Sequence, residues 1–216
     1  MRDLVCFFRI VPPVPPLMVT TFIAVSAVSV GAVAVDARYA AGTFEAVFVL
    51  QLFAVSSGFA GNARRGYYDL LLTRGERRAV IAVVHWALSI TPGVLSWTVL
   101  AAAELALTAG SSAVGVAPGT LVALAVTSTI GWAITVPLPR FAGAIGWVVT
   151  FTMARALRPE RGVPEALVNM ICPLAMVGRR AIPVATVLPV IAVGVVSMMA
   201  ALAWVERMDL PLEAAQ

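Results

Sequence analysis

The side chains that could do nucleophilic chemistry in this chain are its one histidine and a pair of serines. His85 stands inside one apolar run, and Ser56-Ser57-Gly58 lies near the end of the run before it. A serine hydroxyl that hydrogen-bonds a histidine on a neighbouring helix can be activated to attack a carbonyl carbon. His85, next to Trp86, is more simply interpreted as a residue at a membrane interface.

The remaining titratable residues exclude other chemistries. All fifteen basic residues are arginine, so the chain has no lysine for a phosphate-binding loop or a Schiff base. One histidine and two scattered cysteines, Cys6 and Cys172, have no metal-ligand spacing, and we expect no disulfide because the cysteines fall on opposite membrane faces. We therefore expect no metal or cofactor on this chain, and any ATP to be bound by a partner.

Two polar residues inside apolar runs are candidates for a substrate path. They are Gln51 and Glu104. An ionisable group at membrane depth is a functional candidate by default. Glu104 also stands close to an outer loop, where a structural pair or simple interfacial exposure is the simpler explanation.

The elements that must position these residues are membrane-spanning helices. The chain is 61% hydrophobic and 12% charged, with a mean hydropathy of +0.96, whereas soluble domains carry about 25% charged residues. Helical spans need about 20 apolar residues, and several runs approach that length. We predict one all-α integral membrane domain covering residues 1–216.

The runs predict six spans and two irregular regions. Residues 1–16, which end in paired prolines and do not resemble a cleavable signal peptide, are predicted to form an interfacial elbow. Residues 155–182 hold five arginines around a short apolar piece, which predicts a re-entrant or interfacial element between spans five and six. The third span contains Pro92 and is long enough that it should tilt, kink or project. The predicted spans are 17–35, 40–61, 79–108, 120–136, 141–154 and 183–204.

Arginine distribution predicts the orientation. With both termini in the cytoplasm, nine arginines are cytoplasmic and six are outside, five of those six within residues 155–182. We interpret the pI of about 9.8 as topology-setting and not as a nucleic-acid site. The cytoplasmic arginines are Arg2, Arg9, Arg64, Arg65, Arg74, Arg77, Arg78, Arg140 and Arg207.

Small residues and tryptophans mark two further patterns. Small side chains recur at helical spacing in the first and last spans, where they allow either ordinary packing or a dimer face: Ala24, Ala27, Gly31, Ala34, Gly194, Ser197 and Ala201. Three tryptophans near the cytoplasmic ends of their spans suggest an aromatic belt: Trp86, Trp132 and Trp204.

The densest cluster of charge is the arginine segment, residues 64–78, which holds five arginines and must lie in water. Tyr67, Leu70 and Leu71 stand at helical spacing and predict one apolar stripe, with Gly75 as the helix stop. Arg65 and Asp69 are four apart and could pair on the other face. Such a helix suits docking in a partner's groove, or it rests on lipid headgroups.

The segment resembles a motif of type-2 ATP-binding-cassette (ABC) permeases. Gly66-Tyr67-Tyr68-Asp69-Leu70-Leu71-Leu72-Thr73, followed by Arg77, is similar to their Gly-x-x-acidic-Leu-Leu-x-Ser/Thr-Pro-x-x-Arg segment between spans two and three. The outer region before the last span and the short charged tail also agree in order. Arg74 replaces the family's proline, and Arg64 and Arg65 replace acidic residues before the glycine.

The resemblance implies a permease subunit of an exporter that moves substrate by alternating access, in a bacterial cytoplasmic (inner) membrane. It implies that residues 62–78 form a coupling helix on a separate nucleotide-binding subunit, which binds ATP and Mg and hydrolyses the ATP. It also implies a dimer with a second permease copy or paralogue. The contact residues carried over are Arg65, Gly66, Tyr68, Asp69, Leu71 and Arg77.

Two alternatives stay open. The haem-exporter membrane subunit of cytochrome c maturation has a similar six-span plan, and His85-Trp86 resembles its His-Trp pair. An intramembrane serine protease of the rhomboid kind would use His85 and Ser57, although Val55 stands where that family has glycine.

Overall fold

The described part of the chain is entirely helical. The computed structural model describes residues 7–8, 11–36, 39–56, 59–64, 66–73, 75–107, 116–137 and 184–207, and these contain helices and turns but no strand. The helical class predicted from composition is confirmed to this extent. The helices are α2 (Pro16–Val35), α3 (Ala40–Ser56), α4 (Phe59–Arg64), α5 (Asp69–Thr73), α6 (Arg78–Leu107), α7 (Val116–Thr135) and α10 (Val184–Arg207).

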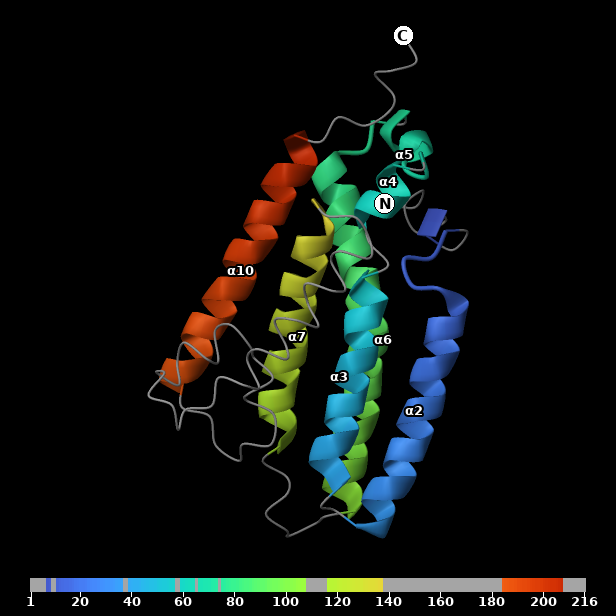
Figure 1. The fold of residues 1–216 in the computed structure, drawn as a ribbon, viewed down its shortest axis with the longest axis vertical. Helices are drawn as coiled ribbons and strands as arrows, with labels where there is room; N and C mark the ends of the chain where they lie inside the picture. The colour runs from blue at the N-terminus through green and yellow to red at the C-terminus, as the bar shows by residue number, and fades with distance from the viewer. Residues whose placement is uncertain are drawn as a thin grey trace.

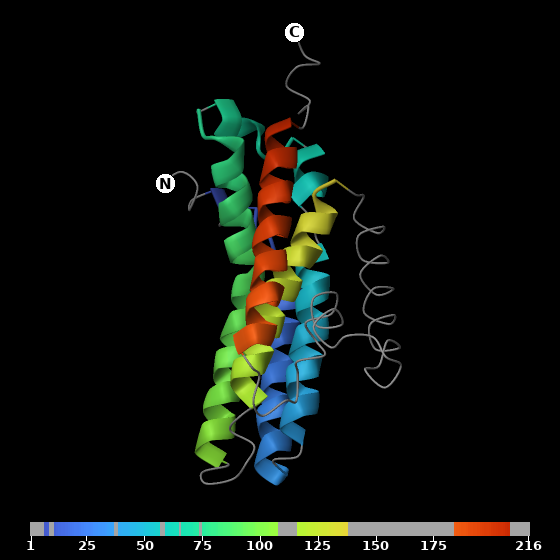
Figure 2. The same ribbon diagram turned by 90° about the vertical axis from the view of Figure 1, so that its left-hand side faces the viewer.

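The long helices form one elongated bundle, and the two short ones lie at one end of it (Figure 1). α3 packs against α2, α6 and α7, and α2 also packs along α6. α10 lies mainly on α7, with a smaller contact to α6. Viewed from the side, α10 crosses the face made by α6 and α7 (Figure 2).

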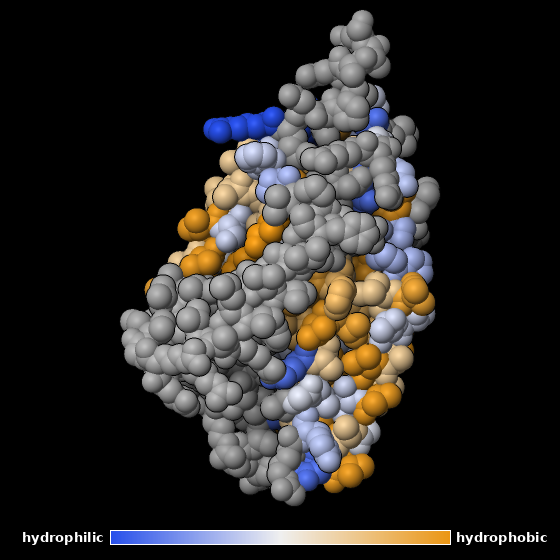
Figure 3. Space-filling model, in the orientation of Figure 1, coloured by the Kyte–Doolittle hydropathy of each residue, from blue (hydrophilic) through white to orange (hydrophobic). Residues whose placement is uncertain are grey.

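The chain is an α-helical membrane protein. Three helices are long and apolar enough to cross a bilayer, Pro16–Val35, Arg78–Leu107 and Val187–Arg207, and two shorter apolar helices, Gly42–Val55 and Thr120–Thr135, accompany them. Large apolar side chains such as Ile23, Leu95 and Val196 are exposed, as lipid-facing residues are. Apolar residues also cover much of the described surface visible in Figure 3.

Several predicted boundaries are close to the observed ones. α2 and α6 agree with the predicted spans to within one residue at each end, and α6 continues through Pro92 as a single helix. The predicted span 40–61 corresponds to two elements, α3 up to Ser56 and α4 from Phe59, and residues 57 and 58 between them lie outside the described residues. The predicted fifth span, 141–154, and the region 155–182 lie outside the described residues.

The two stripes of small residues have different surroundings. Gly194 on α10 faces α7 so closely that an added Cβ would lie 3.3 Å from Val126 Cγ1, and Ala201 is buried. This stripe therefore serves packing within the chain. On α2, Ala27 and Gly31 are exposed together with the rest of their stripe.

Candidate functional site

The arginine segment folds as the end of α4, a tight turn and α5. Gly66 has φ of 71°, its N–H donates to Ala63 O at 3.0 Å, and the Tyr67 N–H donates to Asn62 O at 3.2 Å. This pair of bonds is a Schellman motif, which ends a helix at a left-handed residue. Tyr67 therefore lies in the turn before α5, and the single helical stripe predicted to start at Tyr67 does not form.

A second motif of the same kind ends α5. Gly75 has φ of 80°, its N–H donates to Leu72 O at 3.0 Å, and the Glu76 N–H donates to Leu71 O at 3.1 Å. The helix stop predicted at Gly75 is confirmed. Two glycines in the left-handed conformation, each with a pair of backbone hydrogen bonds, therefore set the two turns of the segment.

The inner face of the segment packs against the bundle. Tyr68 and Leu71 are each only 1% exposed, whereas Tyr67 is 41% exposed. The prediction that Tyr67 lies on the apolar stripe was wrong, since the Gly66 turn rotates Tyr68 inward instead. Tyr68 and Leu71 join a core cluster with Phe8, Phe59, Ile81, Trp132 and Val205. Both therefore anchor the segment and are unavailable for direct partner contact in this conformation.

The outer face of the segment is polar. Thr73, Gly75 and Arg77 are exposed, and Gly66 and Asp69 are half-buried. Asp69 Oδ2 lies 2.7 Å from where a Cβ on Gly66 would be, so a side chain at position 66 would displace the Asp69 carboxylate and would also have to adopt a positive φ. Arg65 is outside the described residues, and its predicted pairing with Asp69 stays a prediction.

Burial affects the titration of Tyr68. Desolvation raises the pKa of its hydroxyl well above the usual value, and the nearby Asn62 side chain offsets only part of this. The phenol is therefore neutral throughout the working range of pH. The ring stacks on Phe59, with centroids 5.0 Å apart and planes at 16°.

His85 lies beneath this anchor and is 0% exposed. Its interpretation as a residue at the membrane interface was wrong: it points into the bundle, where Trp132 Nε1 donates to its Nδ1 at 3.1 Å. Rings of Phe8, Phe59 and Tyr68 surround it, with centroids 5.7 to 6.3 Å away. Trp132 is likewise buried and cannot belong to a lipid-facing belt.

The predicted substrate-path residues are interior residues. Gln51 and Glu104 are each 1% exposed. Gln51 Nε2 donates to Ser89 O at 3.0 Å, and the Gln51 carbonyl oxygen occupies the space that a side chain on Gly93 would need. Gln51 thus joins α3 to α6 within one turn of Pro92.

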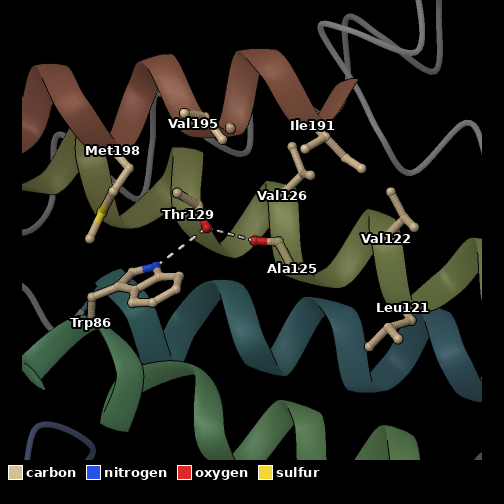
Figure 4. A pocket seen from close by; sticks show the side chains of 10 residues that line it. Trp86, Leu121, Val122, Ala125, Val126, Thr129, Ile191, Val195 and Met198 are labelled. Atoms are coloured by element: carbon tan, nitrogen blue, oxygen red, sulfur yellow. Dashed lines mark hydrogen bonds between the residues drawn. The ribbon is translucent and has the colours of Figure 1, made fainter. Parts of the chain in front are cut away.

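Apolar grooves open elsewhere on the bundle. One of about 420 Å³ lies between α6, α7 and α10, and its polar atoms are already paired: Trp86 Nε1 donates to Thr129 Oγ1 at 3.3 Å, which donates to Ala125 O at 2.8 Å (Figure 4). A second, of about 610 Å³, lies between α2 and α6. Neither groove is lined by Gln51 or Glu104.

The alternative chemistries gain no support from this geometry. The His85 Nδ1 accepts from Trp132, while Ser57 and the side chain of Ser56 are not described. His85 and Trp86 face different surroundings, one enclosed by aromatic rings and the other in an apolar groove. Within the described ranges no group of three His, Cys, Asp or Glu side chains could hold a metal ion.

Comparisons with known proteins add no family. No protein-family model, no curated protein and no solved structure matches this chain.

Two features were missed from the sequence. Trp132 pairs with a histidine 47 positions away, and no local pattern indicates that contact. The polar stripe of α6 could have been found, because His85, Ser89, Gly93 and Ser96 recur at intervals of three or four and are all buried.

Proposed function

We propose that this chain is the membrane-spanning permease subunit of an ABC exporter, driven by a separate ATP-binding subunit. The observation that carries the proposal is the two-sided arginine segment. Its inner side, Tyr68 and Leu71, is buried against the bundle, and its outer side exposes Thr73, Gly75 and Arg77. A partner that pushes on the outer side would move the bundle, because the inner side is anchored in it.

The proposed topology has six spans with the segment and both termini in the cytoplasm. It is supported by contacts that bring the segment, residues near the N-terminus and the end of α10 together at one end of the bundle. Phe8 packs in the same cluster as Tyr68, and the Ala79 N–H donates to Glu206 Oε1 at 3.3 Å near the end of α10. The fifth span, 141–154, remains a prediction from hydropathy.

The absence of lysine supports the placement of ATP binding and of the transport path on different chains. A phosphate-binding loop needs a lysine, so ATP and Mg would be held by the partner. The permease would contribute the transport path and act in a dimer with a second copy or paralogue. Gln51 and Glu104 enter this path only if transport opens the interior where they are buried.

A site-specific cross-linker tests the partnership directly. A photoreactive residue at exposed Thr73 should capture a protein that carries a Gly-x-x-x-x-Gly-Lys-Ser/Thr loop and hydrolyses ATP. The matched control at Val28, exposed on α2, should not capture it. Capture of proteins without that loop, or equal capture from both positions, would contradict the proposal.

Charge-reversal variants test the contact between the arginine segment and the ATPase. Arg77→Glu should reduce co-purification of the ATPase and its stimulated hydrolysis in nanodiscs, and Arg65→Glu and Asp69→Arg should act alike. Arg207→Glu is the control, because Arg207 is an exposed arginine in the last turn of α10. If Arg77→Glu and Arg207→Glu behave identically, the segment is not the docking site.

A further inference from the structure

A chain of contacts leads from the arginine segment to α7 through α6. Tyr68 of the segment lies edge-on to the His85 ring, with centroids 6.3 Å apart and planes at 83°. Phe59 of α4 meets the same ring at 5.7 Å and 81°. His85 in turn is hydrogen-bonded to Trp132 of α7 at 3.1 Å.

The hydrogen bond defines the state of the imidazole. An indole N–H can only donate, so the Nδ1 atom of His85 must be the unprotonated acceptor and the proton lies on Nε2. Nε2 is buried with no hydrogen-bond partner among the described residues. The ring is therefore fixed by the bond from Trp132, by a longer polar contact with Ser89 and by packing, and it cannot rotate without losing the Trp132 bond.

Ser89, one turn after His85 on α6, lies beside the histidine. Ser89 Oγ donates to His85 O at 2.7 Å and lies 3.4 Å from Nδ1, and Gln51 of α3 donates to Ser89 O. The imidazole thus stands where the segment, α3, α6 and α7 are linked. The described contacts to His85 include both an anchor of the segment and a residue of α7.

We propose that His85 is a positioning residue that transmits displacement of the arginine segment to α7 through Trp132. Inward movement of Tyr68 presses on the imidazole edge, and the Nδ1 bond carries the movement to the indole. The biological use of this link rests on the proposed function. The link itself does not, because it can be measured without an ATPase.

The indole N–H signals of the five tryptophans are suitable reporters. Trp86 donates to Thr129, which lies on α7 three residues before Trp132, and Trp86 is absent from the ring contacts of Tyr68. Trp97 donates to Thr120 at 2.8 Å toward the other end of α7 and serves as the internal control. Nitrogen-15 tryptophan spectra in nanodiscs, assigned by Trp→Phe variants, resolve the reporters.

The experiment compares the response to Tyr68→Ala in two backgrounds. In the otherwise unchanged chain we expect the Trp86 signal to shift and the Trp97 signal to stay. In Trp132→Phe, which keeps a ring but removes the donor, the Trp86 response should be lost. A Trp86 response that persists in Trp132→Phe, or that is absent from the unchanged background, would overturn the proposal.

Two further variants keep the test decisive. If Tyr68→Ala does not fold, Leu71→Val makes a smaller disturbance of the same anchor and should give the same pattern. His85→Ala should abolish the response as Trp132→Phe does, because either change breaks the link. A response unaffected by both variants would mean that the segment reaches α7 by another route, whether or not an ATPase partner is ever found.

Discussion

At each end of the α6–α7 pair a tryptophan indole donates a hydrogen bond to the other helix, but the surroundings of the two bonds differ. At the segment end Trp132 donates to His85, both residues are 0% exposed, and three further aromatic rings enclose the imidazole. At the far end Trp97 donates to Thr120 from a half-buried position among aliphatic side chains and Phe48. The first bond lies in the cluster that holds the segment, whereas the second joins α6 to α7 away from the segment, so removing them should have unequal consequences.

The largest loss of stability is expected when a buried leucine is truncated at either end of the bundle. Leu71→Ala and Leu100→Ala remove equally buried side chains, so each should cost about 2 to 5 kcal/mol of unfolding free energy. Only Leu71→Ala should release the segment, which trypsin would then cleave faster at its arginines. Thermal unfolding and limited proteolysis in nanodiscs check this; equal protection of the segment in both variants would contradict its anchoring.

The glycines of the segment should rank next. Gly66→Ala places a Cβ against Asp69 at positive φ and should cost about 2 kcal/mol or more, while Gly75→Ala, with open space around it, should cost about 1 kcal/mol. Gly31→Ala on exposed α2 has neither problem and should be neutral or slightly stabilising. Unfolding midpoints measured on the three variants would refute the ranking if Gly31→Ala were the worst.

Removing the two indole donors separates the ends of the helix pair directly. Trp132→Phe leaves a buried imidazole without its donor and should cost about 2 kcal/mol, since stranded buried polar atoms cost about 1 to 3 kcal/mol. Trp97→Phe should cost about 1 kcal/mol, because a threonine hydroxyl within a helix can donate to a backbone carbonyl of the preceding turn. Denaturation curves should show this order, and a reversed order would remove the distinction between the two ends.

The smallest effect should appear at alkaline pH. Burial raises the pKa of Tyr68, so the folded state keeps the proton after the unfolded state has lost it at about pH 10. The contribution of neutral Tyr68 is complete below that pH and declines above it, by about 1 kcal/mol near pH 11. Tyr68→Phe should lessen the alkaline loss of stability, whereas the control Tyr67→Phe should not.

Local signals in the sequence were sufficient for the long helices. The apolar run of α2 lies between paired prolines and Asp36, and that of α6 begins after Arg78 and ends before a stretch of small residues, so their bounds could be predicted within one residue. Gly75 could be identified as a helix stop for the same reason, since a left-handed turn depends on one residue type. The division of this region into α3 and α4 was not predicted, because residues 40–61 are mostly apolar.

The site depended on contacts that no local pattern encodes. Which of the adjacent residues Tyr67 and Tyr68 faces inward was decided by the turn at Gly66. The partner of His85 stands 47 residues away and meets it only because α6 packs against α7. Composition alone determined a helical membrane protein, because the cost of burying charge in lipid acts on each residue separately. The anchor and the His85 link were decided by the tertiary structure, because packing depends on residues from several helices at once.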